Sequence, residues 1–207
     1  EMCIRDSYVS ESKIQKKDNL KQLASKLEVG DVVFIHVSVL PFEKISSTTE
    51  SWTNHVGIVV DVSGDEPLIG ESRVPFSGIT TFSRFVSRSK AGRVEVKRMN
   101  ETFDEQQKSN VLLSAKARSW ILYDTGFNLY SKRQFCSRYV HEVLNEATGI
   151  NVGEVQNFTT LLENNPKTDL KFWTIWYFGN IPWDRKTITP VSLLQSKQMT
   201  TLFDGRV

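Results

Sequence analysis

Cys136 is the residue whose type and position most favour chemistry, since it lies near the start of the strongest predicted helix, residues 134–147. Free backbone N–H groups and the positive end of the helix dipole stabilise an anion at such a position. A thiol placed there has a lowered pKa, and the thiolate is the nucleophilic form. The helical repeat also puts Cys136 on the core-facing stripe. Cysteine is among the most buried residue types, so an inert core thiol is the alternative interpretation.

A thiolate nucleophile needs a base that also serves as its counter-ion, and the sequence offers three histidines. His55 opens a predicted strand and lies on the face opposite its large apolar residues. His141 lies roughly 140° around the helix from Cys136 and points away from it. His36 fits a core position in another strand. We therefore expect His55 to be the base, although a lone histidine at a strand end is more often structural.

Glu71 is the candidate third group, which would orient the imidazole and stabilise its charged form. It lies in a predicted strand over residues 68–73, after a turn at 63–67. If this strand pairs with the strand that carries His55, the two side chains become neighbours on one face of a sheet. The alternative for Glu71 is a surface carboxylate paired with Arg73.

Motifs of several other chemistries are absent. The sequence has no phosphate-binding loop, no dinucleotide-binding glycine motif, no HExxH, no CxxC and no GxSxG. The histidines lie at no metal-ligand spacing, so we expect no metal and no other cofactor. A net charge of +2 over 207 residues argues against nucleic-acid binding. No apolar run approaches the roughly 20 residues that a membrane-spanning helix needs.

The elements that must position these residues indicate one α+β domain, because 39% hydrophobic and 24% charged residues are ordinary for a chain with a single core. Strands are expected at residues 31–37, 55–62, 68–73 and 93–98. Helices are expected at 16–27, at 80–88, from an N-cap at Thr102 with Glu105 as capping box to about Trp120, at 134–147, at 158–163 and as a turn at 190–194. Residues 172–178 are ambiguous. Strands come first and helices later, so we expect an antiparallel sheet.

The chain is expected to have three segments. Residues 1–7 fit no helix or strand pattern and are interpreted as a non-native leader, residues 8–28 as a polar N-terminal helix or extension, and residues 29–207 as a single domain. Cys3 lies in the leader, which leaves Cys136 as a lone thiol. A lone thiol favours a reducing compartment, so we expect a cytoplasmic protein.

Three short motifs together resemble a known family: residues 54–59 (NHVGIV), 71–75 (ESRVP) and 133–137 (RQFCS). They are similar to the circularly permuted papain-like amidase family of YiiX, YaeF and YebB, and most similar to its YebB-like members. Further matches lie at residues 30–34, 72–75, 83–85, 181–183 and 189–190. The resemblance runs from about residue 29 to about residue 194, and its motifs occur in the family's order, with His ahead of Cys.

The resemblance implies a permuted papain-like, NlpC-type fold, in which an antiparallel sheet packs against helices that include the cysteine-bearing helix. It implies Cys136 as nucleophile, His55 as general base and Glu71 as the residue that orients the imidazole. The oxyanion hole would use backbone N–H groups at the start of the cysteine helix. The side-chain candidates for substrate or oxyanion contact are Tyr123, Asn54 and Gln134.

Arg138 departs from relatives such as YiiX, which often carry an acidic residue at this position, and we interpret it as a solvated side chain. The aromatic residues within 172–183 could wall an apolar acyl pocket or contact a membrane surface, although a core layer is favoured. Peripheral membrane contact is therefore left open. A set of basic residues is interpreted as a solvated face: Arg84, Arg88, Lys90, Arg93, Lys97 and Arg98.

We therefore expect a cysteine hydrolase of amidase or peptidase type, which forms a thioester acyl-enzyme from an amide or ester. Its partner would be a small amide, peptide or lipid-like substrate. Two alternatives remain: a lipid acyl hydrolase or acyltransferase, and a non-catalytic binding module on the same fold. The sequence does not indicate an oligomeric state.

Overall fold

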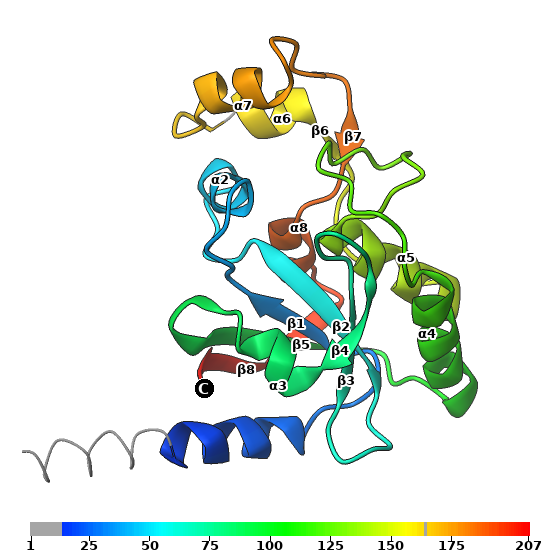
Figure 1. Ribbon diagram of the computed structural model, residues 1–207. Coiled ribbons are helices and arrows are strands. Elements are labelled where there is room, and N and C mark those ends of the chain that lie inside the picture. Colours follow the sequence, from blue (N-terminus) through cyan, green and yellow to red (C-terminus); the bar gives the residue numbers. More distant parts are fainter. Residues whose placement is uncertain (1–13, 164) are drawn as a thin grey trace, which may run out of the picture.

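A six-stranded antiparallel sheet forms the centre of the computed structural model, which describes residues 14–163 and 165–207 (Figure 1). The strand order is β4-β3-β2-β1-β5-β8. The strands are β1 (Val32–Ile35), β2 (His55–Asp61), β3 (Leu68–Glu71), β4 (Gly78–Thr81), β5 (Arg93–Met99) and β8 (Met199–Arg206). The predicted α+β fold with an antiparallel sheet is confirmed. The predicted leader, residues 1–7, lies outside the described residues.

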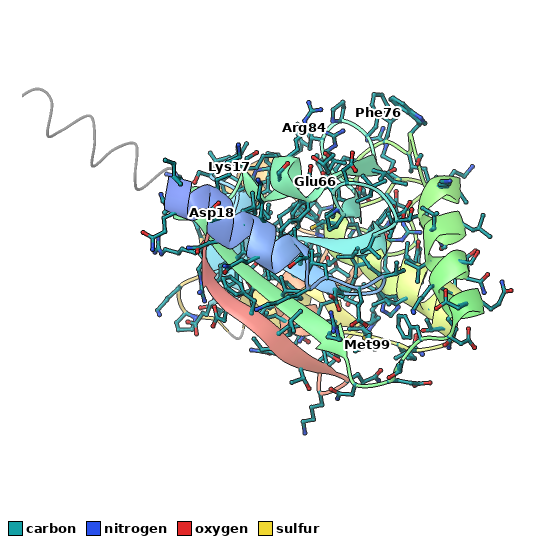
Figure 2. The ribbon with its side chains drawn as sticks, turned by 90° about the horizontal axis from the view of Figure 1, so that it is seen from below. Lys17, Asp18, Glu66, Phe76, Arg84 and Met99 are labelled. Atoms are coloured by element: carbon teal, nitrogen blue, oxygen red, sulfur yellow. The ribbon has the colours of Figure 1, made fainter. Side chains whose placement is uncertain are left out.

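The helices gather on two sides of this sheet (Figures 1 and 2). A helix over residues 14–24 runs below the strands, and α5 and α4 pack against β2 from another side. The other helices are α2 (Phe42–Thr48), α3 (Phe82–Val86), α4 (Glu105–Ala117), α5 (Cys136–Thr148), α6 (Phe158–Glu163), α7 (Leu170–Trp176), α8 (Pro190–Leu194) and a 3₁₀ turn at Lys90–Gly92. Two short strands, β6 (Gln156–Asn157) and β7 (Lys186–Thr187), pair with each other. None of the described helices is both long and apolar enough to cross a membrane.

The central strands follow from their sequence. β1 reads VVFI and is buried throughout, because it lies between β2 and β5 and is covered on both faces. β2 is buried from His55 to Val60 for the same reason. A polar side chain in this strand is therefore removed from water by the fold itself, and it needs a partner there.

Helix α5 carries the apolar stripe that the sequence predicts. Val140, Val143, Leu144 and Ala147 are buried against the core. The helix ends, as predicted, at Gly149, whose φ of 77° lies in the left-handed region that glycine adopts without strain. Its packing against β2 and β3 fixes the direction in which its first residue faces.

Several predicted boundaries were wrong. The N-cap of α4 is Asp104, not Thr102, because the Asp104 side chain accepts a hydrogen bond from the Gln107 N–H and the Asp104 N–H donates one to Gln107 Oε1. Residues 80–88 contain only a short helix, since 78–81 pair with β3 as an extra strand. The ambiguous aromatic segment is mostly helical, as α7.

The elements that sequence analysis missed include α2 and β8, besides β4 and the short strands β6 and β7. The α2 segment follows Pro41 and contains a Ser-Ser-Thr run, a composition typical of a loop. Strand β8 lies at the sheet edge and exposes most of its residues, so it lacks a strong apolar signal.

Candidate active site

Cys136 is the first residue of α5, two residues later than the predicted helix start. The residue before it, Phe135, has an extended backbone and makes no side-chain capping hydrogen bond. The first N–H groups of a helix have no intrahelical acceptor, so those beside the thiol remain available to an incoming anion. The side chain is a free thiol and the residue is only 2% exposed.

The pairing of β2 with β3 brings His55 and Glu71 together. The register pairs Ile58 with Gly70, and one further step places Glu71 across from Gly57, which shares a strand face with His55. His55 Nε2 lies 2.6 Å from Glu71 Oε2, and both side chains are almost fully buried. The predicted neighbour relation across the turn is therefore present in the fold.

His55 is poised as a cation at neutral pH. Burial alone lowers the pKa of His55, but the adjacent Cys136 sulfur and the Glu71 carboxylate outweigh burial and raise it to about 9. Because Nε2 is bonded to Glu71, Nδ1 is the nitrogen left to exchange a proton with the thiol. Nδ1 is buried and forms no hydrogen bond with any described residue, so it stands ready for a partner.

The Glu71 carboxylate is held from more than one side. Arg88 Nη2 lies 2.6 Å from Oε1, the oxygen that His55 does not use, and Arg73 Nε lies 3.7 Å from the same oxygen. Burial raises the pKa of Glu71, but the hydrogen bond to His55 and the positive charges of His55 and Arg88 more than offset burial and lower it. Glu71 is thus kept ionised although it is fully buried.

Aromatic rings fix the plane of the imidazole. Phe85 stacks on His55 with ring centres 5.6 Å apart, and Phe42 meets the same ring edge-on at 6.3 Å. The Arg88 guanidinium lies 5.1 Å from the centre of the Phe85 ring. A Cβ at Gly57 would come within 2.9 Å of Phe85, so a glycine is needed for this stacking.

Arg88 and the two phenylalanines are the site residues that sequence analysis missed. The interpretation of Arg88 as part of a solvated face is wrong, because its side chain reaches the buried carboxylate of Glu71. Its position in a run of scattered basic residues gave no signal of this contact. Phe42 lies in the missed helix α2, which explains its omission.

The three remaining site candidates have different surroundings. The Tyr123 hydroxyl lies 4.0 Å from Cys136 Sγ, and burial raises the pKa of Tyr123 well above its usual range, so it remains a donor. Asn54 uses both ends of its amide on the main chain of Val37. Gln134 donates from Nε2 to Glu142, while its buried Oε1 has no partner among the described residues.

Arg138 is not a solvated side chain, which corrects the interpretation of this departure. It pairs with Glu142 at 2.7 Å and donates to the carbonyl oxygens of Ser131 and Arg133. It therefore fastens the segment that leads into α5. Its position places its charge on that loop, with no contact to the thiol.

An apolar cavity opens beside the thiol. The cavity has a volume of about 60 Å³, so it is a narrow slot with room for a slender group. Its walls come from α2, α5, α6, α7 and the segment before α8. They include Ile45, Phe127, Phe135, Cys136, Phe158, Leu162, Trp173, Tyr177 and Ile188.

Helices α2 and α7 are fastened to each other where they border this cavity. Lys44 Nζ lies 2.7 Å from Asp169, and the Trp173 indole N–H donates to the Thr48 hydroxyl at 3.0 Å. Trp173 itself is buried, whereas Phe178, just beyond α7, is fully exposed. The aromatic cluster is thus partly a core layer, as favoured, and partly the wall of the cavity.

Residues 26–203 match the sequence profile of the family described as permuted papain-like amidase enzymes, YaeF/YiiX, C92 family. The chain belongs to this family. The uncharacterized protein YiiX of Escherichia coli strain K12 is 25% identical over 175 residues, which cover 84% of this chain and 85% of that protein. The predicted family is confirmed, while the preference for YebB-like members stays a prediction.

A crystal structure of YiiX from Escherichia coli O157:H7 has the same fold, with a TM-score of 0.79 and 25% identity over 87% of this chain and 98% of that one. That protein is described as a metalloprotein. Within residues 14–163 and 165–207 of the present chain, no three His, Cys, Asp or Glu side chains form a group able to hold a metal ion. The donor set of these described residues therefore does not fit a metal centre.

Proposed function

We propose that this protein is a cysteine hydrolase that cleaves an amide or ester whose acyl part is slender and apolar. The observation that carries the proposal is the buried pair of His55 and Glu71 beside a thiol at an uncapped helix start. A carboxylate, an imidazole and a thiol in this order supply the orienting group, the base and the nucleophile of acyl transfer.

In the resting pair the Cys136 proton already lies on His55 Nδ1, and Cys136 Sγ attacks the carbonyl carbon as the thiolate. The negative charge on the carbonyl oxygen is stabilised by the first N–H groups of α5, with the Tyr123 hydroxyl as a further donor. His55 then gives the proton to the departing nitrogen or oxygen, which leaves a thioester on Cys136. A water molecule that His55 deprotonates attacks the thioester and restores the thiol.

The cavity beside Cys136 supports the substrate class. Its lining is almost wholly apolar, so a charged or strongly polar acyl part would lose its hydration there without gaining hydrogen bonds. The same observation favours a second candidate, a lipid acyl hydrolase or acyltransferase, in which the acyl chain is longer and the acceptor differs from water. Both candidates share the thioester step.

Trapping of the thioester tests the proposal. The protein is incubated with short-chain and medium-chain aryl esters and N-acyl amides, and its intact mass is measured before and after hydroxylamine treatment. We expect an acyl adduct on Cys136 that hydroxylamine removes, no adduct in Cys136→Ala, and an unchanged adduct in Cys3→Ser.

Two results would overturn it. Turnover that survives Cys136→Ala would show that the thiol is not the nucleophile. Neither adduct nor turnover over the whole series, in a protein that binds the same acyl compounds, would make this a binding module.

A further inference from the structure

A narrow two-stranded ribbon lies outside the main sheet. Residues 74–77 run along residues 121–123, which follow a turn at Trp120, and we call residues 74–77 and 120–123 the Phe76 ribbon. The Trp120 N–H donates to the Ser77 oxygen, and the Tyr123 N–H donates to the Pro75 oxygen, both at 2.9 Å. Phe76 pairs directly with Leu122 across the ribbon. Residues 74–77 and 121–123 are therefore fixed in register, with alternate residues on opposite faces.

The two faces of the ribbon differ in character. On the inner face Ser77 and Tyr123 are buried, and Tyr123 reaches the thiol. The outer face carries four apolar side chains that are exposed to solvent. They are Val74 (57% exposed), Phe76 (38%), Trp120 (81%) and Leu122 (48%).

These four residues form one patch. The Phe76 and Trp120 rings lie 6.1 Å apart, and Trp120 holds a φ of 65°, in the left-handed region that a bulky residue rarely adopts. Figure 2 shows Phe76 at the periphery of the molecule, pointing outward. An exposed cluster that includes Trp and Phe at adjacent positions indicates an interaction surface.

The surroundings of the patch are basic. The three segments that build this region, residues 72–79, 116–123 and 128–134, contain five Lys or Arg residues and no Asp or Glu. Residues 132–134 run beside the ribbon, since the Gln134 N–H donates to the Leu122 oxygen at 3.0 Å. Within the described residues Lys116, Lys132 and Arg133 form no ion pair with a carboxylate.

We propose that the outer face of the Phe76 ribbon docks on an anionic lipid bilayer. Trp120 and Phe76 enter the headgroup region, and Lys132 and Arg133 pair with lipid phosphates. The charge argues for lipid over a second copy of the chain, because a symmetric dimer through this patch would set like charges against each other. The docking site differs from the aromatic segment 172–183, where sequence analysis had left membrane contact open.

Vesicle flotation tests the proposal with the full chain and needs no turnover, so its failure leaves the proposed hydrolase untouched. The probes are vesicles of phosphatidylcholine alone and vesicles that also contain phosphatidylglycerol. We expect flotation only with the anionic vesicles, and weaker flotation as salt is added. Trp120→Ala should weaken binding at least about tenfold, since a large apolar contact is lost.

The charge variant Lys132→Glu with Arg133→Glu should weaken binding by more than about twentyfold, because each cation near an anionic surface contributes about a fivefold factor. The matched controls are Phe178→Ala, another exposed aromatic, and Lys17→Glu with Lys21→Glu, a double charge reversal on the N-terminal helix. Both controls should float like the unaltered protein. Circular dichroism checks that each variant is folded.

Three outcomes would overturn the proposal. The protein does not float with anionic vesicles, or the control variants weaken flotation as much as the ribbon variants do. The third outcome is that the protein binds no vesicles but self-associates in light scattering, and that Trp120→Ala abolishes this self-association. That result would make the patch a protein interface.

Discussion

Arg88 Nη2 lies 2.6 Å from Glu71 Oε1, on the carboxylate oxygen that His55 does not use. One buried carboxylate thus accepts short hydrogen bonds from two cations, and its charge is divided between them. The division limits how strongly Glu71 stabilises the imidazolium, because part of its field is neutralised by the guanidinium. Arg88 also covers Phe85, the ring on which His55 stacks, so it acts on the imidazole through both neighbours.

Arg88→Ala is expected to raise the pKa of His55 above its present value of about 9, because the Glu71 charge then acts more fully on the imidazolium. Turnover should fall roughly tenfold as the carboxylate loses an anchor. NMR titration of the His55 ring protons measures the shift in pKa. In Arg88→Lys, which keeps the positive charge, the pKa of His55 should return most of the way to about 9.

The control for this change is Arg84→Ala, an exposed arginine in α3, the helix that precedes Arg88. Arg73 could move onto the vacated oxygen, so the double variant with Arg73→Ala is measured as well. Two other titratable groups face the pair: Tyr139 lies near Glu71, and Cys136 lies near His55. Tyr123 in turn contacts Cys136. An unshifted titration in the double variant would refute a positioning role for Arg88.

Alkylation of Cys136 should depend on His55. With an imidazolium next to the thiol at neutral pH, iodoacetamide is expected to react at about pH 6 nearly as fast as at about pH 8. His55→Ala should slow the reaction at about pH 6 by at least about tenfold. The experiment uses a Cys3→Ser background, and peptide mapping identifies the labelled residue. His141→Ala serves as control, since His141 bonds to the Val152 oxygen and lies away from the thiol; equal slowing in both variants would contradict the prediction.

Local patterns were sufficient to place His55 beside Glu71. The two strands are separated by a short turn, and alternation along each strand fixes the shared face. The start of α5 was predicted two residues early because Gln134 belongs to a bridge with Tyr123, a contact that a helical repeat cannot show. The structure brings Cys136 to the same place, while the catalytic roles stay predictions.

Long-range contacts account for what the sequence could not reveal. Arg88 reaches Glu71 only because β4 and α3 fold back along β3. Phe42 and the cavity walls depend on α2 and α7, which are joined through Lys44 and Asp169 across a large separation in sequence. From composition alone, the α2 segment resembles a loop and the α7 segment is ambiguous.

The cavity predicts a preference for acyl length. Each methylene that fits should raise kcat/KM about fourfold until the slot is full. Leu162 lines the cavity, so Leu162→Phe should reduce its volume. The variant should lose the gain in kcat/KM for longer p-nitrophenyl esters and keep its kcat/KM for the acetate ester. The matched control is Leu202→Phe, a partly exposed leucine on the edge strand β8. A length profile that Leu162→Phe leaves unchanged would place the acyl group elsewhere.

The buried imidazolium predicts how stability varies with pH. A histidine whose pKa is raised on folding, here to about 9 from 6.5, stabilises the fold fully below its unfolded value and loses that contribution as pH rises through the folded value. The free energy of unfolding should therefore fall by at most roughly 3 kcal/mol between about pH 6.5 and about pH 9. Urea unfolding followed by circular dichroism measures this fall. In His55→Asn the free energy of unfolding should fall less over the same pH interval, by about that amount. If it falls equally with pH in both proteins, His55 is not held as a cation.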